Sequence, residues 1–255
     1  MCLLLFAWRP DSARTLVLAG NRDEFHDRPA APADWWDGNI VGGRDLRAGG
    51  SWLATHRDGR FAVVTNYREP LVEGRGPRSR GELVTAFLQG DATPARFSRE
   101  LAARASRYAG FNLLLGSPAE LVYFSNRGRG PELLEAGIYG LSNHLLDTPW
   151  PKLERTHIRF RALLEADASE AEYLDMLADR EPAPAEALPD TGIGPEWERL
   201  LSAPFIVSPH YGTRCSTLLR IGSDGELGFV ERRFDPVGEC SGESAFRFRI
   251  GGVGR

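Results

Sequence analysis

Cys2 is the residue of this 255-residue sequence with the clearest capacity for chemistry. Removal of Met1 is expected because the side chain that follows is small, and it would leave one residue carrying both a thiol and an α-amine. The α-amine has a reference pKa of about 7.7–8.0, so a useful fraction is neutral near pH 7 and can take the thiol proton. This is the N-terminal version of a nucleophile and base pair. The alternative is a Cys that merely starts a buried strand.

Polar side chains fall where predicted strands end, and side chains there can converge at the rim of a sheet. Arg22 and Asp23 follow the second predicted strand, whose hairpin partner begins at Cys2. A guanidinium near the sulfur would favour thiolate, and a carboxylate near the amine would orient it. Asn66 and Asn143 also end strands, and an Asn amide can donate to a developing oxyanion. Each residue alone is more often a solvated turn residue.

Other candidates for the site are ligand-binding side chains. Arg214 begins a strand and could hold a carboxylate or phosphate through two hydrogen bonds, although a surface ion pair is the alternative. Asn21 and Glu24 belong to the same polar stretch as Arg22. Three tryptophans could line a ligand mouth, although aromatic residues more often close a loop over a core. These are Trp35, Trp36 and Trp52.

Hydrophobic periodicity predicts the order strands, helix pair, strands, helix pair, strands. Antiparallel hairpins with segregated helix pairs indicate an α+β fold, a four-layer αββα sandwich of two stacked, mainly antiparallel sheets. Residues 29–36 are expected in a long surface loop. Predicted strands cover 3–8, 15–19, 51–56, 61–66, 111–115, 121–125, 138–143, 213–221, 227–234 and 246–250, and predicted helices cover 80–88, 94–108, 151–164 and 169–177.

Composition sets the broad class of the protein. The length and 42% hydrophobic content fit a single domain, residues 1–255. The net charge of −4 argues against nucleic-acid binding. The apolar run 3–8 is too short for a membrane span or signal segment, so the cytoplasm is the expected location. Three Cys without CxxC spacing indicate neither a disulfide framework nor a zinc site. The histidines show no metal-ligand spacing, although a haem contact from one of them stays open.

The sequence resembles the NRDE proteins, also called the transport-and-Golgi-organisation family, nearly end to end. The motifs that carry the resemblance occur in this order: Met1-Cys2, Asn21-Arg22-Asp23-Glu24-Phe25, Gly50-Ser51-Trp52-Leu53, Thr65-Asn66-Tyr67, Arg80-Gly81-Glu82-Leu83-Val84, Gly110-Phe111-Asn112-Leu113, Tyr139-Gly140-Leu141-Ser142-Asn143, Pro149-Trp150-Pro151-Lys152 and Tyr211-Gly212-Thr213-Arg214.

The resemblance implies an N-terminal-nucleophile hydrolase fold similar to penicillin V acylase and bile-salt hydrolase. Those sites use a processed N-terminal Cys, an early Arg and Asp, two Asn and a later Arg. The matching positions here are Cys2, Arg22, Asp23, Asn66, Asn143 and Arg214. In those acylases other residues separate the early Arg and Asp. Here the two are adjacent and would point to opposite faces of a continuing strand, so either Asp23 or Glu24 is the inward carboxylate.

Two functions follow from these features. The first is a cysteine amidohydrolase that cleaves a linear, non-peptide amide and requires no cofactor. Cys2 would attack the carbonyl, Asn66 and Asn143 would stabilise the oxyanion, Arg22 would tune the thiolate and Arg214 would hold the substrate. The second is a non-catalytic protein that binds or traffics haem or an acyl lipid such as acyl-CoA, as the resemblance also implies. The sequence leaves the oligomeric state open.

Overall fold

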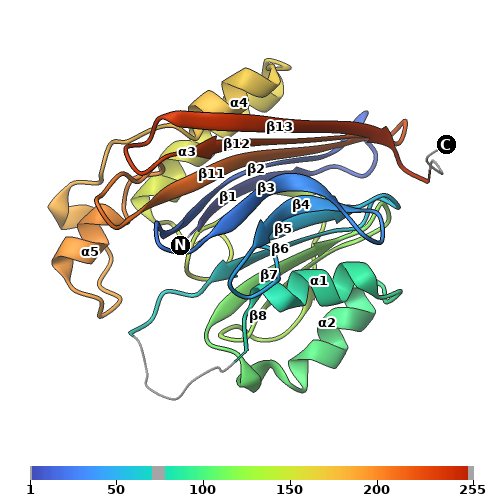
Figure 1. Ribbon diagram of the computed structural model, residues 1–255, viewed down its shortest axis with the longest axis horizontal. Helices are drawn as coiled ribbons and strands as arrows, with labels where there is room; N and C mark the ends of the chain where they lie inside the picture. The colour runs from blue at the N-terminus through green and yellow to red at the C-terminus, as the bar shows by residue number, and fades with distance from the viewer. Residues whose placement is uncertain (1, 71–77, 252–255) are drawn as a thin grey trace.

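The structure, a computed structural model, describes residues 2–70 and 78–251. Two antiparallel sheets are stacked face to face (Figure 1). In spatial order, the six-stranded sheet contains β10 (Gly137–Leu141), β1 (Cys2–Trp8), β2 (Arg14–Phe25), β11 (Tyr211–Gly222), β12 (Glu226–Phe234) and β13 (Cys240–Arg249). The seven-stranded sheet contains β3 (Ala30–Trp36), β4 (Ile40–Asp45), β5 (Leu53–His56), β6 (Phe61–Asn66), β7 (Phe111–Gly116), β8 (Leu121–Ser125) and β9 (Glu132–Leu133).

Helices cover the outer face of each sheet. α1 (Gly81–Gln89) and α2 (Pro94–Ala102) pack on the seven-stranded sheet, and α3 (Pro151–Glu165) and α4 (Glu170–Met176) pack on the six-stranded sheet (Figure 1). A fifth helix, α5 (Pro195–Leu200), lies beyond them near the start of β11. The predicted αββα sandwich is confirmed. Short 3₁₀ turns occupy Ala105–Arg107 and Ala185–Ala187.

Three apolar cores hold the four layers together, and strand β1 contributes to two of them. Leu4 and Phe6 point into the core between the sheets, whereas Leu3 and Leu5 point toward α3 and α4. All four side chains are fully buried. A strand with both faces covered reads as a continuous apolar run, which explains the opening of the sequence. The burial on both faces fixes the position of Cys2 at the start of this strand.

Two sequence expectations about the first forty residues are wrong. Strand β2 does not end near Ala19 but continues to Phe25, so the polar stretch after Gly20 lies within the strand. Residues 30–36 form strand β3 rather than a loop. β3 is the edge strand of its sheet and has a register shift between Ala31 and Asp34. An edge position and a bulge both tolerate Pro32, which hides the strand pattern in the sequence.

Among the described residues, no helix combines the length and apolar character needed to cross a membrane.

Candidate active site

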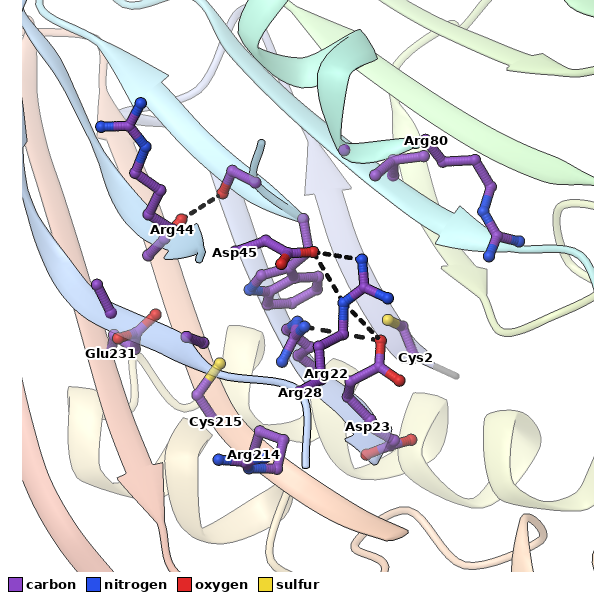
Figure 2. Close-up of a pocket in the computed structure, with 18 of the residues that line it drawn as sticks. Cys2, Arg22, Asp23, Arg28, Arg44, Asp45, Arg80, Arg214, Cys215 and Glu231 are labelled. Atoms are coloured by element: carbon purple, nitrogen blue, oxygen red, sulfur yellow. Dashed lines mark hydrogen bonds and ion pairs between the residues drawn. The ribbon is translucent and has the colours of Figure 1, made fainter. Parts of the chain in front are cut away.

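A cavity of about 550 Å³ opens between the two sheets at the end where β1 begins (Figure 2). Its walls come from both sheets and from the segment that leads into α1. The lining is predominantly polar and rich in arginine. The described residues that line it are Cys2, Arg22, Asp23, Glu24, Arg28, Ala30, Ala31, Pro32, Gly43, Arg44, Asp45, Ser51, Trp52, Val64, Asn66, Arg78, Ser79, Arg80, Gly81, Ala109, Arg214, Cys215, Glu231, Arg233, Phe234 and Ser241.

Strand register sets Cys2 and Arg22 side by side in the cavity wall. Cys2 pairs with Arg22 across β1 and β2, and Arg22 pairs with Cys215 across β2 and β11. Cross-strand partners share a face of the sheet, so a guanidinium lies between two thiols. Burial raises the pKa of the Cys2 thiol, and the positive charge of Arg22 opposes that rise. The Cys2 thiol therefore stays protonated until a base accepts its proton.

The backbone nitrogen of Cys2 is held by Asn143. It donates to Asn143 Oδ1 at 3.4 Å, and Asn143 Nδ2 donates to the backbone oxygen of Asn66 at 2.9 Å. Asn143 is fully buried and is not part of the cavity wall. Its amide nitrogen donates internally and lies outside the cavity wall, so this geometry positions the Cys2 nitrogen. The side-chain amide of Asn66 lines the cavity and has no hydrogen-bond partner among the described residues.

Adjacent residues of β2 divide between the two faces of the sheet. Arg22 and Glu24 form an ion pair at 3.7 Å on the cavity side. The Asp23 carboxylate points away from the Arg22 and Arg28 side chains (Figure 2). It accepts a hydrogen bond from Thr213 Oγ1 at 2.7 Å and is 1% exposed. Glu24 is thus the carboxylate of the cavity ion pairs, whereas Asp23 borders the cavity but is almost fully buried.

The cavity walls carry more positive than negative side chains. Seven arginines and four acidic residues line the described part of the cavity. Arg28 is paired with Asp45 at 2.6 Å and lies 3.8 Å from Glu24. In contrast, Arg44, Arg80 and Arg214 have no ion pair with any described residue. The cavity therefore has an excess of positive charge.

Arg214 reaches the cavity but also supports the backbone. Its Nη1 donates to the carbonyl oxygens of Phe25 and His26 at 3.1 and 3.2 Å. Part of its guanidinium is therefore committed to fixing the end of β2. Among the described residues, the Arg80 side chain makes one hydrogen bond, from Nη1 to the carbonyl oxygen of Gly110. Burial lowers the pKa of Arg80, and the nearby Glu24 and Cys2 oppose that change. Arg80 thus lies within electrostatic reach of the Cys2 thiol.

Close backbone packing places Arg80 at the cavity. Gly50 meets Gly81 so closely that a β-carbon added at Gly50 would lie 2.4 Å from the Gly81 carbonyl carbon. The Ser51 backbone nitrogen also donates to the Gly81 oxygen at 3.3 Å. These contacts bring the start of α1 against the seven-stranded sheet and hold Arg80 at the cavity wall. The Arg80-Gly81 motif in the sequence was the available signal for this residue.

Three predicted ligand-binding residues lie elsewhere. Asn21 is fully buried on the outer face of its sheet, where its side chain bonds the carbonyl oxygens of Leu177 and Pro204. Trp35 packs against Phe246 and Phe248. The indole of Trp36 donates to the Gly42 oxygen. Because these side chains are used in packing and internal hydrogen bonds, their assignment to the ligand mouth is wrong. Trp52 does line the cavity.

Sequence reasoning also missed a buried charged cluster behind Cys2, which we call the Lys152 cluster: Asp23, Arg68, Lys152 and Glu198. Arg68 and Glu198 form an ion pair at 2.5 Å, and both are almost fully buried. Burial and the nearby Arg68 lower the pKa of Lys152 to about 8. Burial raises the pKa of Asp23, and Lys152 opposes that rise. Four residues far apart in sequence thus form one electrostatic unit beneath the site.

The described residues contain no group of three or more His, Cys, Asp or Glu side chains arranged to hold a metal ion. None of the five histidines is among the described residues that line the cavity.

Comparison with solved structures identifies the fold. The structure resembles that of a mutant conjugated bile acid hydrolase from Clostridium perfringens, with a TM-score of 0.52 over 96% of this chain and 92% of that chain, at 8% identity. The chain has the N-terminal-nucleophile hydrolase-like fold.

The sequence then identifies the family. Residues 1–236 match Transport and Golgi organisation 2, and the chain belongs to that family. It is 37% identical to the Transport and Golgi organization protein 2 homolog of Bos taurus over 91% of this chain and 92% of the relative. The human homolog is also 37% identical, with the same coverage.

Proposed function

We propose that this protein is a cysteine amidohydrolase that becomes active when removal of Met1 exposes the amine of Cys2. One observation carries the proposal: the nitrogen of Cys2 is held by Asn143 while its side chain lines the cavity. Nucleophile and base are then positioned by the same strand end. The position of Arg22 beside the sulfur supports the formation of a thiolate.

The proposed reaction uses the groups already described. The α-amine of Cys2 takes the thiol proton, and the sulfur attacks the amide carbonyl carbon. The Asn66 amide donates to the oxyanion. The ammonium then gives its proton to the leaving nitrogen as the carbon–nitrogen bond breaks, which leaves a thioester. Water, deprotonated by the same amine, hydrolyses the thioester and restores the thiol.

The charge of the cavity supports a linear, non-peptide amide with an anionic group near the scissile bond. Arg80 and Arg44 line the cavity without an acidic partner among the described residues. Arg80 is partly buried, and an arginine withdrawn from water without a counterion binds carboxylates and phosphates strongly because the interaction is little screened. A substrate carboxylate or phosphate would provide the missing partner.

The test begins with intact mass, which should show loss of Met1 in the active protein. The substrates are N-acyl amino acids, each compared with its carboxamide analogue. Cys2→Ala should lower kcat on the order of 1,000-fold or more. Cys240→Ala, at an exposed thiol outside the cavity, should leave it unchanged. Activity in protein that retains Met1, or activity that depends on Cys215 instead of Cys2, would overturn the proposal.

The same cationic cavity supports a second candidate, reversible binding of an acyl-CoA-like ligand without hydrolysis. Haem fits less well, because the described lining offers no histidine and its two cysteines have raised pKa values. Titration with palmitoyl-CoA and with haemin separates these cases. Saturable palmitoyl-CoA binding that weakens in Arg80→Ala, with no turnover of the amide panel, would favour the binding function.

A further inference from the structure

The basic residues of this chain are distributed in an unusual way. The sequence has 31 Lys and Arg residues, and Lys152 is the single lysine among them. Lysines are almost always at the surface unless they are paired. Here arginine supplies the positive charge everywhere else, and Lys152 is 1% exposed. A side chain used once, in the interior, has a role that arginine does not fill.

The surroundings of Lys152 are the Lys152 cluster and Cys2. Lys152 is the second residue of α3, whose first turn packs under β1 and β10. Its Nζ is buried and has no hydrogen-bond partner among the described residues. The charged groups that act on it are Arg68, Asp23, Cys2 and Glu198. Glu198 is already paired with Arg68, so the negative charge left to balance Lys152 is that of Asp23.

Lysine and arginine differ in one property that matters here. A guanidinium stays protonated at any physiological pH, whereas a buried ammonium titrates readily. Burial and Arg68 lower the pKa of Lys152 to about 8, close to the reference range of an α-amine. Asp23 acts electrostatically on both Cys2 and Lys152. Asp23 follows Arg22, the cross-strand partner of Cys2, and both Asp23 and Lys152 are 1% exposed, so the buried carboxylate interacts electrostatically with the start of β1 and with the side chain on α3.

That interaction affects the amine of the mature Cys2. A buried carboxylate beside an amine stabilises its ammonium form, which cannot act as a base. A second cation, the ammonium of Lys152, weakens this stabilisation by interacting with the same carboxylate, and it also repels the ammonium form of the amine. We infer that Lys152, acting through Asp23, keeps the amino group of the mature Cys2 unprotonated near neutral pH, as a positioning residue. This inference rests on the proposed function, since it assigns a task to that same amine.

The first experiment needs no substrate. Protein labelled with [ε-¹³C]lysine gives one lysine signal, because the chain has one lysine. We expect this signal to titrate near pH 8 and to titrate at lower pH in Asp23→Asn, since the carboxylate favours the ammonium. Glu100→Gln, at an exposed site on α2, should leave it unchanged. Thr213→Val, which removes the hydroxyl that donates to Asp23, tests the same link if Asp23→Asn does not fold.

Two results overturn the inference at this stage. One is titration of Lys152 at the ordinary value of an exposed lysine. The other is a Lys152 titration that neither Asp23→Asn nor Thr213→Val changes.

The second experiment uses the pH profile of amide hydrolysis. In Lys152→Met, the acid limb of kcat/KM should move to higher pH, with roughly tenfold lower kcat/KM at pH 7 and little change above pH 9. A uniform loss at every pH with an unmoved limb indicates a structural role and overturns the inference. If the wild-type protein hydrolyses no amide but the Lys152 signal responds to Asp23→Asn, the proposed function fails while the coupled pair stands.

Discussion

At the end where Cys2 lies, the two faces of the six-stranded sheet differ in how their charged side chains are buried and paired. On the inner face, Arg22 and Glu24 belong to ion pairs at the wall of a cavity open to ligand. On the outer face, Asp23 and Lys152 are each 1% exposed and interact electrostatically. Charges at a solvated wall attract a ligand at little cost to stability, whereas buried charges shift one another's pKa values. One strand, β2, supplies both faces with consecutive residues.

The largest expected effect comes from breaking the buried ion pair between Arg68 and Glu198. Arg68→Met leaves the Glu198 carboxylate buried without its cation, and we expect a loss of about 3–5 kcal/mol in the free energy of unfolding. Urea denaturation at pH 7 measures it. Arg96→Met, which breaks an exposed pair with Glu100, should change stability by less than about 0.5 kcal/mol. Equal effects of the two substitutions would contradict the distinction between buried and solvated charges.

The second effect is a pH dependence of the free energy of unfolding, caused by the titration of Lys152. Its folded pKa, about 8, is below the ordinary lysine value of 10.5, so the unfolded chain binds more protons between those values. The free energy of unfolding should therefore rise with pH in that window, by about 2 kcal/mol between pH 7.5 and 9.5. Lys152→Met should lack this rise. Parallel profiles of the two proteins in urea denaturation would count against a lowered pKa.

A third effect concerns the cavity. Iodoacetate and iodoacetamide both alkylate a thiol, but only iodoacetate carries a carboxylate. Arg80→Ala should lower the ratio of their rates at Cys2 about tenfold, because a little-screened cation attracts the anionic reagent. Peptide mass spectrometry gives the two rates. Arg99→Ala, at an exposed site on α2, is the matched control and should not change the ratio.

The smallest effect is expected for the pair of Arg28 and Asp45 at the cavity wall. Burial raises the pKa of Asp45, but hydrogen bonds from Arg28 and from backbone nitrogens outweigh it and hold that pKa below its usual value. The stabilisation is present above the unfolded-state value, about 4, and is lost as pH falls through the folded-state value. Asp45→Asn should cost less than about 1 kcal/mol at pH 7, and less still in 1 M salt. A cost as large as that of Arg68→Met would mean that this wall is not solvated.

The sequence by itself determined the layers and the candidate nucleophile. The hairpin at residues 51–66 and the helices near residues 81, 94, 151 and 169 were predictable because their hydrophobic periods and turn residues act within a few positions. Cys2 could be singled out because a thiol next to a removable Met is a local feature. The continuation of β2 through Asp23 was not predictable, since pairing with β11, almost two hundred residues away, stabilises it.

Only the tertiary structure decided how the charged residues are divided. Asp23 and Glu24 are neighbours in sequence, but the pleat brings Asp23 to a buried hydrogen bond with Thr213 and Glu24 to an ion pair with Arg22. Arg80 lines the cavity because Gly50 and Gly81 pack closely, and Lys152 is buried because α3 lies on β1. Each placement depends on packing between distant segments, and the burial that shifts the pKa values of Cys2, Asp23 and Lys152 follows from that packing.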